Sequence, residues 1–181
     1  MGFLTPTSHG ELDNLRVYAL QQLAQMRTTV VGLSDEQAHS TPTASSLNLS
    51  GLLLHAGAVA VYWSACAAAA PGDPELPEGM DDLPLEELVA DGRSLADVLD
   101  NFDRCVEVAT ANFAAVSDLS APVPVPPAPW FPEDLVSWEA RWALAHISTE
   151  IARHVGHADI IRETLDGKGS YELNDLAEAG A

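Results

Sequence analysis

The chain has 181 residues, 47% of them apolar and 19% charged, and its 27 acidic side chains against eight lysines and arginines give a net charge of −19. A chain of this size and composition is typical of one soluble globular domain with a sizeable core. Because such a surface repels phosphate backbones and anionic lipids, we expect neither nucleic-acid nor membrane binding. We expect a single domain over residues 1–181, with a core over about 8–167 and a surface tail over 168–181.

The cellular compartment is expected to be the cytoplasm. The N-terminal residues lack a basic segment followed by an apolar run, so the sequence predicts no export. Cys66 and Cys105 have no close spacing, and we interpret them as small core residues and not as a disulfide or redox pair.

The first helix is expected to open near Ser8, because Glu11 follows three residues later as in a capping box, and to end at Gly32. A loop rich in serine and threonine comes next.

The second helix carries the first candidate site residues. Asn48 or Ser50 can cap its start, it runs to about Ala70, and it contains His55 and Trp63. This apolar stretch approaches the length of a membrane span, but its many small residues suit close helix packing. We therefore expect a buried helix of a bundle.

A long crossover is expected between the second and third helices. Residues 71–91 include eight acidic and no basic residues and several prolines, which predicts irregular chain with one short turn around residues 85–90. Such a connection joins helices that run parallel. The third helix is predicted to begin at Ser94, with Asp97 as its capping partner, and to close near Ser117.

Residues 121–132 contain six prolines, which excludes a helix and favours an extended strap, with Trp130 and Phe131 packing over apolar surface. Ser137 is expected to cap the last long helix, which ends before Gly167. No strand-like alternation appears, so we predict an all-α four-helix bundle without a sheet.

The last helix carries an ionisable stripe, formed by His146, Glu150, His154 and His157, which fall within an arc of about 80° on a helix. Side chains three or four apart converge, as in helical metal sites. With His55, two stripe residues would supply three ligands and leave a position open, and imidazole and carboxylate donors suit zinc, nickel or iron(II). The alternatives are a hydrogen-bonded core histidine at position 55, and a solvated face or an internal hydrogen-bond network in the stripe.

Two segments resemble a known family. The string HISTEIARHVGHADIIRE, followed by LDG, resembles the last-helix signature of the DinB-like four-helix metalloprotein superfamily, and in particular its actinobacterial branch of unknown function. The loop before the second helix is similar to the same branch in its order of residues, which is Leu33, Ser34, Asp35, Glu36, Pro42, His55 and then Trp63.

The resemblance implies a ligand set. In that superfamily, which includes mycothiol-dependent maleylpyruvate isomerase, one histidine of the second helix and a pair four apart on the last helix bind a divalent ion, which implies His55, Glu150 and His154 here. His146, and His157 with Asp159, would then support the ligands or line the pocket, and His146 could replace Glu150 if the helix is rotated slightly. The chain departs from the branch at Ala60, where a glutamate is frequent.

The resemblance also implies a function. We expect a metal-dependent enzyme that acts on a small-molecule substrate with a low-molecular-weight thiol such as mycothiol or bacillithiol, as a transferase or isomerase. His157 or His146 would move a proton, and Arg153 and Trp63 would contact the substrate.

Two other classes of protein remain as alternatives to an enzyme. One is a non-catalytic metal- or small-ligand-binding stress-response protein, with the site closed by His146 or His157, and the other is a helical dimer module without an ion. We also expect a homodimer, through aromatic residues around the strap. These residues are Trp130, Phe131, Trp138 and Trp142.

Overall fold

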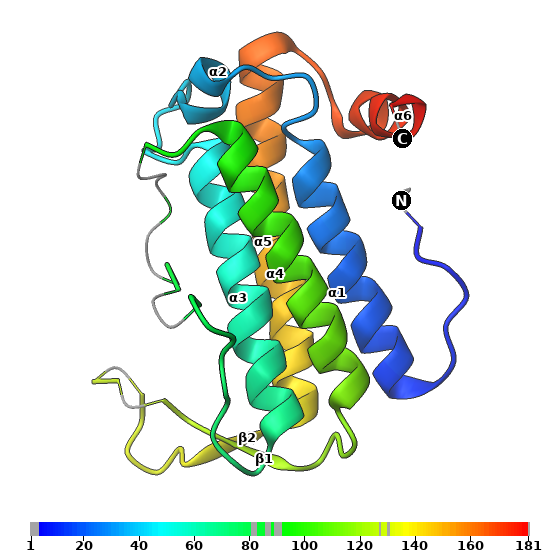
Figure 1. Ribbon diagram of the computed structural model, residues 1–181, viewed down its shortest axis with the longest axis vertical. Coiled ribbons are helices and arrows are strands. Elements are labelled where there is room, and N and C mark those ends of the chain that lie inside the picture. The colour runs from blue at the N-terminus through cyan, green and yellow to red at the C-terminus, as the bar shows by residue number, and fades with distance from the viewer. Residues whose placement is uncertain are drawn as a thin grey trace.

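The computed structural model describes residues 4–80, 83–85, 88, 92–126, 128–129 and 131–180. Over these residues, four long helices lie side by side along the molecule (Figure 1). They are α1 (Gly10–Thr28), α3 (Leu49–Ala69), α4 (Leu95–Ala115) and α5 (Ala140–Asp166). The helices α1 and α5 run in one direction while α3 and α4 run in the other (Figure 1), so the connection between α3 and α4 joins parallel helices.

The predicted all-α bundle with a long crossover is confirmed. The short turn predicted at residues 85–90 lies mostly outside the described residues.

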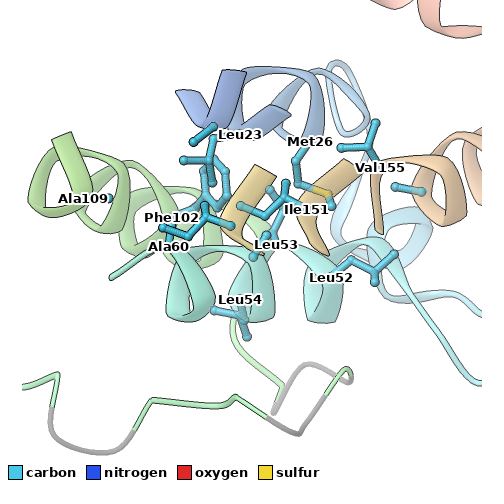
Figure 2. Packing of buried hydrophobic residues seen from close by; sticks show 14 of the residues in the cluster. Leu23, Met26, Leu52, Leu53, Leu54, Ala60, Phe102, Ala109, Ile151 and Val155 are labelled. Carbon is cyan, nitrogen blue, oxygen red and sulfur yellow. The ribbon is translucent and has the colours of Figure 1, made fainter. Parts of the chain in front are cut away.

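The helix α3 forms the centre of the core, with α4 on one side and α5 on another. Most of its residues are buried, and Leu52, Leu53 and Ile151 lie within one apolar cluster between α3 and α5 (Figure 2). By length and hydropathy α3 could cross a membrane, but 78% of its apolar window is buried inside the bundle, as in the core helix of a soluble protein. Cys66 and Cys105 are free and buried, as expected.

Several helix ends follow the predicted capping chemistry. The Asn48 side chain accepts a hydrogen bond from the Gly51 amide at 2.7 Å, and the Ser94 hydroxyl accepts one from the Asp97 amide at 3.1 Å. The helix α5 ends at Gly167, whose φ of 78° is the left-handed conformation that favours glycine.

The first helix begins near the predicted position, but the predicted capping box of Ser8 and Glu11 is wrong. The helix α1 begins at Gly10, and the side chain of its N-cap residue His9 makes no capping hydrogen bond. Glu11 instead forms an ion pair with Arg141 of α5, at 2.8 Å, and the Asp13 carboxylate accepts the His9 amide hydrogen at 2.9 Å. The other end also differs, because α1 stops at Thr28 and a turn carries the chain to Gly32.

A small sheet contradicts the expectation of none. Strands β1 (Pro122–Pro124) and β2 (Ser137–Glu139) pair antiparallel, with Val123 opposite Trp138. Prolines lack an amide hydrogen but are tolerated on edge strands, and a two-stranded sheet consists only of edges. Ser137 therefore lies in β2 and does not cap α5, whose first amides donate to the carbonyls of Ala121 and Leu119 at 2.9 and 3.0 Å.

Two short helices complete the described chain. The helix α2 (Asp35–His39) begins with a capping box in which Ser34 and Gln37 exchange hydrogen bonds. The helix α6 (Ser170–Ala179) replaces the surface tail with a helix that packs on α1. Within it Leu173 is fully buried, and the Asn174 amide exchanges two 2.9 Å hydrogen bonds with Gln25 of α1.

Candidate metal centre

Three predicted side chains meet between α3 and α5. His55 of α3 faces Glu150 and His154 of α5, and one donor atom from each lies within 4.8 Å of the others. The His154 Nε2 is 3.0 Å from Glu150 Oε1, and His55 Nε2 is 3.7 Å from the same oxygen. Distances of this size allow one small cation to contact all three groups after slight adjustment.

The rotation of α5 is set by its apolar face. Ile147 and Ile151 are 0% and 1% exposed, and they pack in the core between the long helices. Because Glu150 and His154 stand one turn apart on the neighbouring face, burial of these isoleucines directs both side chains toward His55.

His55 is a buried histidine with unsatisfied nitrogens. It is 6% exposed, and neither ring nitrogen has a hydrogen-bond partner of good geometry among the described residues. Burial lowers the pKa of His55, as does the neighbouring His154, while Glu150 and the Pro84 carbonyl act in the opposite direction. The ring is therefore neutral at pH 7 and has a free lone pair, which fits a metal ligand better than a core histidine.

Glu150 supplies the negative charge of the cluster. Burial acts to raise its pKa, but hydrogen bonding and charge from His154, together with His146 and His55, lower the pKa below the ordinary value. The carboxylate is thus ionised at neutral pH. Two imidazoles and one carboxylate are donors that suit a divalent ion such as zinc, nickel or iron(II).

His157 contacts the cluster through the Nδ1 atom of His154. Its Nδ1 lies 3.4 Å from His154 Nδ1, while His154 Nε2 points to Glu150. A proton on His154 Nδ1 can be donated to His157, which leaves His154 Nε2 free to bind an ion. His157 therefore contacts the ring nitrogen of His154 that does not face Glu150.

His146 belongs to an aromatic stack, formed by Trp138, Trp142 and His146. The Trp142 ring lies parallel to Trp138 at 4.0 Å and to His146 at 4.9 Å, with interplanar angles of 7°. Trp63 of α3 stands edge-on to all three rings, at 5.2 to 5.7 Å. Burial lowers the pKa of His146, and Glu150 opposes this effect.

A cavity of about 330 Å³ opens beside His55 and Glu150. Aromatic side chains, namely Tyr62, Trp63, Phe131 and His146, line much of its other wall. The volume is in the range of small-molecule sites. A larger hollow of about 440 Å³ lies between α1, α4 and α6, but its described lining contains no histidine, cysteine or carboxylate.

A family model described as mycothiol-S-transferase matches residues 14–167. The chain belongs to the mycothiol S-transferase family. This family is a member of the DinB-like superfamily, so the resemblance seen in the sequence is confirmed. No curated protein and no solved structure matches the chain.

The span that matches the mycothiol S-transferase family contains the whole candidate metal centre and the cavity residues, and it stops before α6. The cluster of potential ligands found over the described residues is His55, Glu150 and His154, without His146 or His157.

The two predicted substrate contacts have different positions. Trp63 lines the cavity, whereas Arg153 is exposed on α5 and is not among the described lining residues. The aromatic stack was not predicted, although Trp138, Trp142 and His146 follow one another at a spacing of four residues. The Pro84 carbonyl beside His55 was not predicted either, because the sequence contains no signal for it.

Proposed function

We propose that this protein is a metal-dependent transferase that joins a low-molecular-weight thiol, mycothiol, to an electrophilic small molecule. The observation that carries the proposal is the set of three converging donors, His55, Glu150 and His154, beside an open cavity. Over the described residues no fourth protein donor joins them, and three ligands with one open position are typical of catalytic sites. Membership of the mycothiol S-transferase family supports the choice of thiol.

The three donors would hold a divalent ion, and such an ion lowers the pKa of a thiol bound at the open position. In the reaction the sulfur forms a bond to the electrophilic carbon, and the bond from that carbon to its leaving group breaks. The leaving group takes the electron pair, and the thiol proton is released.

The other histidines would have separate roles. His146 lines the cavity and is neutral above its lowered pKa, so it can accept the thiol proton. His157 contacts the distal nitrogen of His154 and would position that ligand. A non-catalytic metal-binding protein would need a closed site, and neither histidine belongs to the described ligand cluster.

The test combines metal content with thiol transfer. Protein purified without nickel resin and then loaded with zinc, nickel or iron(II) is analysed by elemental mass spectrometry, and consumption of mycothiol is followed with iodoacetamide as electrophile. We expect about one ion per chain and thiol transfer above the uncatalysed rate. His55→Ala, Glu150→Gln and His154→Ala should each lose at least about tenfold in metal affinity and in activity.

His39→Ala is the matched control, because His39 lies on α2 and is absent from the ligand cluster. It should retain metal and activity. A protein that binds no ion in any of these preparations refutes the proposal. A loaded protein without thiol transfer would instead support a binding-only function.

A further inference from the structure

The wall of the cavity opposite the candidate metal centre is aromatic. Tyr62, Trp63 and Phe131 line it together with His146. Tyr62 shares a hydrogen bond with Cys66, so its hydroxyl is engaged and its ring remains as the surface for a ligand. A wall of this kind favours ligands with flat apolar groups.

Trp63 is held in one orientation by its neighbours. Its ring makes edge contacts with Tyr62 at 5.2 Å, with Trp138 at 5.7 Å and with Trp142 at 5.3 Å. Phe131 is fixed in the same way, edge-on to Trp138 at 5.4 Å. A surface already ordered before binding loses little side-chain entropy when a ligand packs against it.

Apart from the proposed metal ion, no permanent positive charge is found among the described residues that line this space. The described lining contains no lysine or arginine, and the sequence has none over residues 71–91 or 121–132, the two segments that contribute Leu85, Pro126, Ala128 and Phe131 to the wall. A carboxylate or phosphate group on the ligand would thus find no ion-pair partner among the side chains of this wall.

We propose that the electrophile is an uncharged molecule with a planar aromatic group, which packs against Trp63 and Phe131 while its reactive carbon faces His55 and Glu150. This inference rests on the proposed thiol transfer and adds the class of the second substrate. Trp63 and Phe131 are specificity-determining residues in this scheme.

The test uses iodoacetamides that share one reactive group. The N-methyl, N-cyclohexylmethyl and N-benzyl derivatives form the same bond to sulfur and release the same iodide, so differences in kcat/KM, corrected for the uncatalysed rates, report the appended group. We expect the N-benzyl compound to exceed the N-methyl compound by at least about tenfold and the N-cyclohexylmethyl compound by at least about threefold.

Substitutions in the cavity wall test which residues cause the preference for the N-benzyl compound. In Trp63→Leu and in Phe131→Leu the ratio of N-benzyl to N-methyl rates should fall several-fold. Phe113→Leu is the matched control, since Phe113 is a buried aromatic residue of α4 outside the cavity lining, and it should keep the wild-type ratio. Equal rates with the three compounds, or a ratio unchanged by both cavity variants, would overturn the inference while leaving thiol transfer established.

A binding measurement separates this inference from the proposed function. N-benzylacetamide and N-methylacetamide lack the iodine and cannot react, and their binding to the metal-loaded protein can be followed by ligand-observed NMR. Binding of the benzyl compound at least about tenfold tighter, and lost in Trp63→Leu but not in Phe113→Leu, supports the aromatic site even if no thiol transfer occurs. No preference for the benzyl compound refutes it.

Discussion

At the scale of single residues, Arg162 is the largest charged group in the core. It is 2% exposed, pairs with Asp166 of its own helix at 3.0 Å, and donates to the carbonyls of Thr29 and Val31 at 2.8 and 2.9 Å. Arg162 therefore satisfies carbonyls in the turn that follows α1 and joins this turn to α5. Burial opposes ionisation of Asp166, but hydrogen bonds from Arg162 and Lys168 lower its pKa to about 2.

Replacement of Arg162 by methionine should lower the free energy of unfolding by about 3 to 5 kcal/mol, because the carbonyls of Thr29 and Val31 lose their donor inside the fold and Asp166 loses its ion-pair partner. Urea denaturation followed by circular dichroism measures the change. Arg153→Met is the control on the same helix, since Arg153 is exposed, and it should stay within about 0.5 kcal/mol of wild type. Equal effects of the two substitutions would contradict the role of Arg162.

The buried position of His146 predicts a pH dependence. Because its folded-state pKa is lowered from 6.5, the neutral ring contributes stability that is complete above pH 6.5 and is lost as the pH falls toward the folded-state value. The metal-free protein should therefore show a decrease in Tm between pH 7.5 and pH 5.5, measured by differential scanning calorimetry.

In His146→Phe, which keeps an aromatic ring between Trp142 and the cavity, this decrease should be smaller. His55 and Glu150 are present in both proteins, and since His146 helps to lower the pKa of Glu150, the comparison reports His146 together with its effect on that carboxylate. An identical decrease in the two proteins would show that His146 is accessible to protonation in the folded state.

At the scale of elements, α3 and α4 approach each other closely at Gly57 of α3. A Cβ atom at this position would stand 3.1 Å from the Cβ of Cys105 on α4. The helix α5 contains a glycine in the opposite situation, because a Cβ on Gly156 would meet nothing within 4 Å.

The two glycines should respond with opposite signs to alanine. Gly57→Ala is expected to destabilise the protein by about 1 kcal/mol, since crowding against α4 exceeds the gain in helix propensity. Gly156→Ala should stabilise it by about 0.5 to 1 kcal/mol, through propensity alone. Urea midpoints of both variants provide the test, and equal signs would mean that α3 and α4 are not in close contact at Gly57.

The helix ends show which features of the fold could be predicted from the sequence. The ends marked by Asn48, Ser94 and Gly167 were predictable because each residue satisfies the helix backbone locally. Ser8 and Ser137 carry the same local signal, but long-range partners decide these two starts, namely Arg141 for Glu11 and the Ala121 carbonyl for the first amide of α5. Such contacts across the fold leave no trace in a local pattern.

The candidate metal centre was predictable for a similar reason. Helical spacing indicated the stripe on α5, and His55 on a second helix was the expected further ligand. The choice of Glu150 and His154 within the stripe followed from the family resemblance. Its surroundings were not predictable, because the aromatic stack and the Pro84 carbonyl depend on how α3, α5 and the crossover pack.

At the scale of the whole molecule, the net charge of −19 opposes compaction. Salt screens repulsion beyond about 10 Å at 0.1 M, so the Tm should rise between 20 and 300 mM sodium chloride. Glu133 and Asp134 are exposed, and the double variant Glu133→Gln and Asp134→Asn should show a smaller rise. A Tm that falls with salt would indicate that favourable ion pairs outweigh repulsion.

The homodimer, like the cytoplasmic location, stays a prediction. Trp130 lies outside the described residues, and Phe131, Trp138 and Trp142 contact one another or Trp63 within the chain. Sedimentation velocity of the purified protein decides the oligomeric state.

If the proposed ion is bound, the position of His55 on α3, with Glu150 and His154 on α5, would link metal supply to the survival of the folded chain. These residues are distant in sequence and come together only when the two helices pack, so an ion would bind the native state and not isolated segments. At a free ion concentration one hundred times the dissociation constant, such binding adds about 2.7 kcal/mol to the free energy of unfolding. A cell that is depleted of the ion would therefore hold less of the protein as well as a less active form, because the unfolded fraction is open to proteolysis.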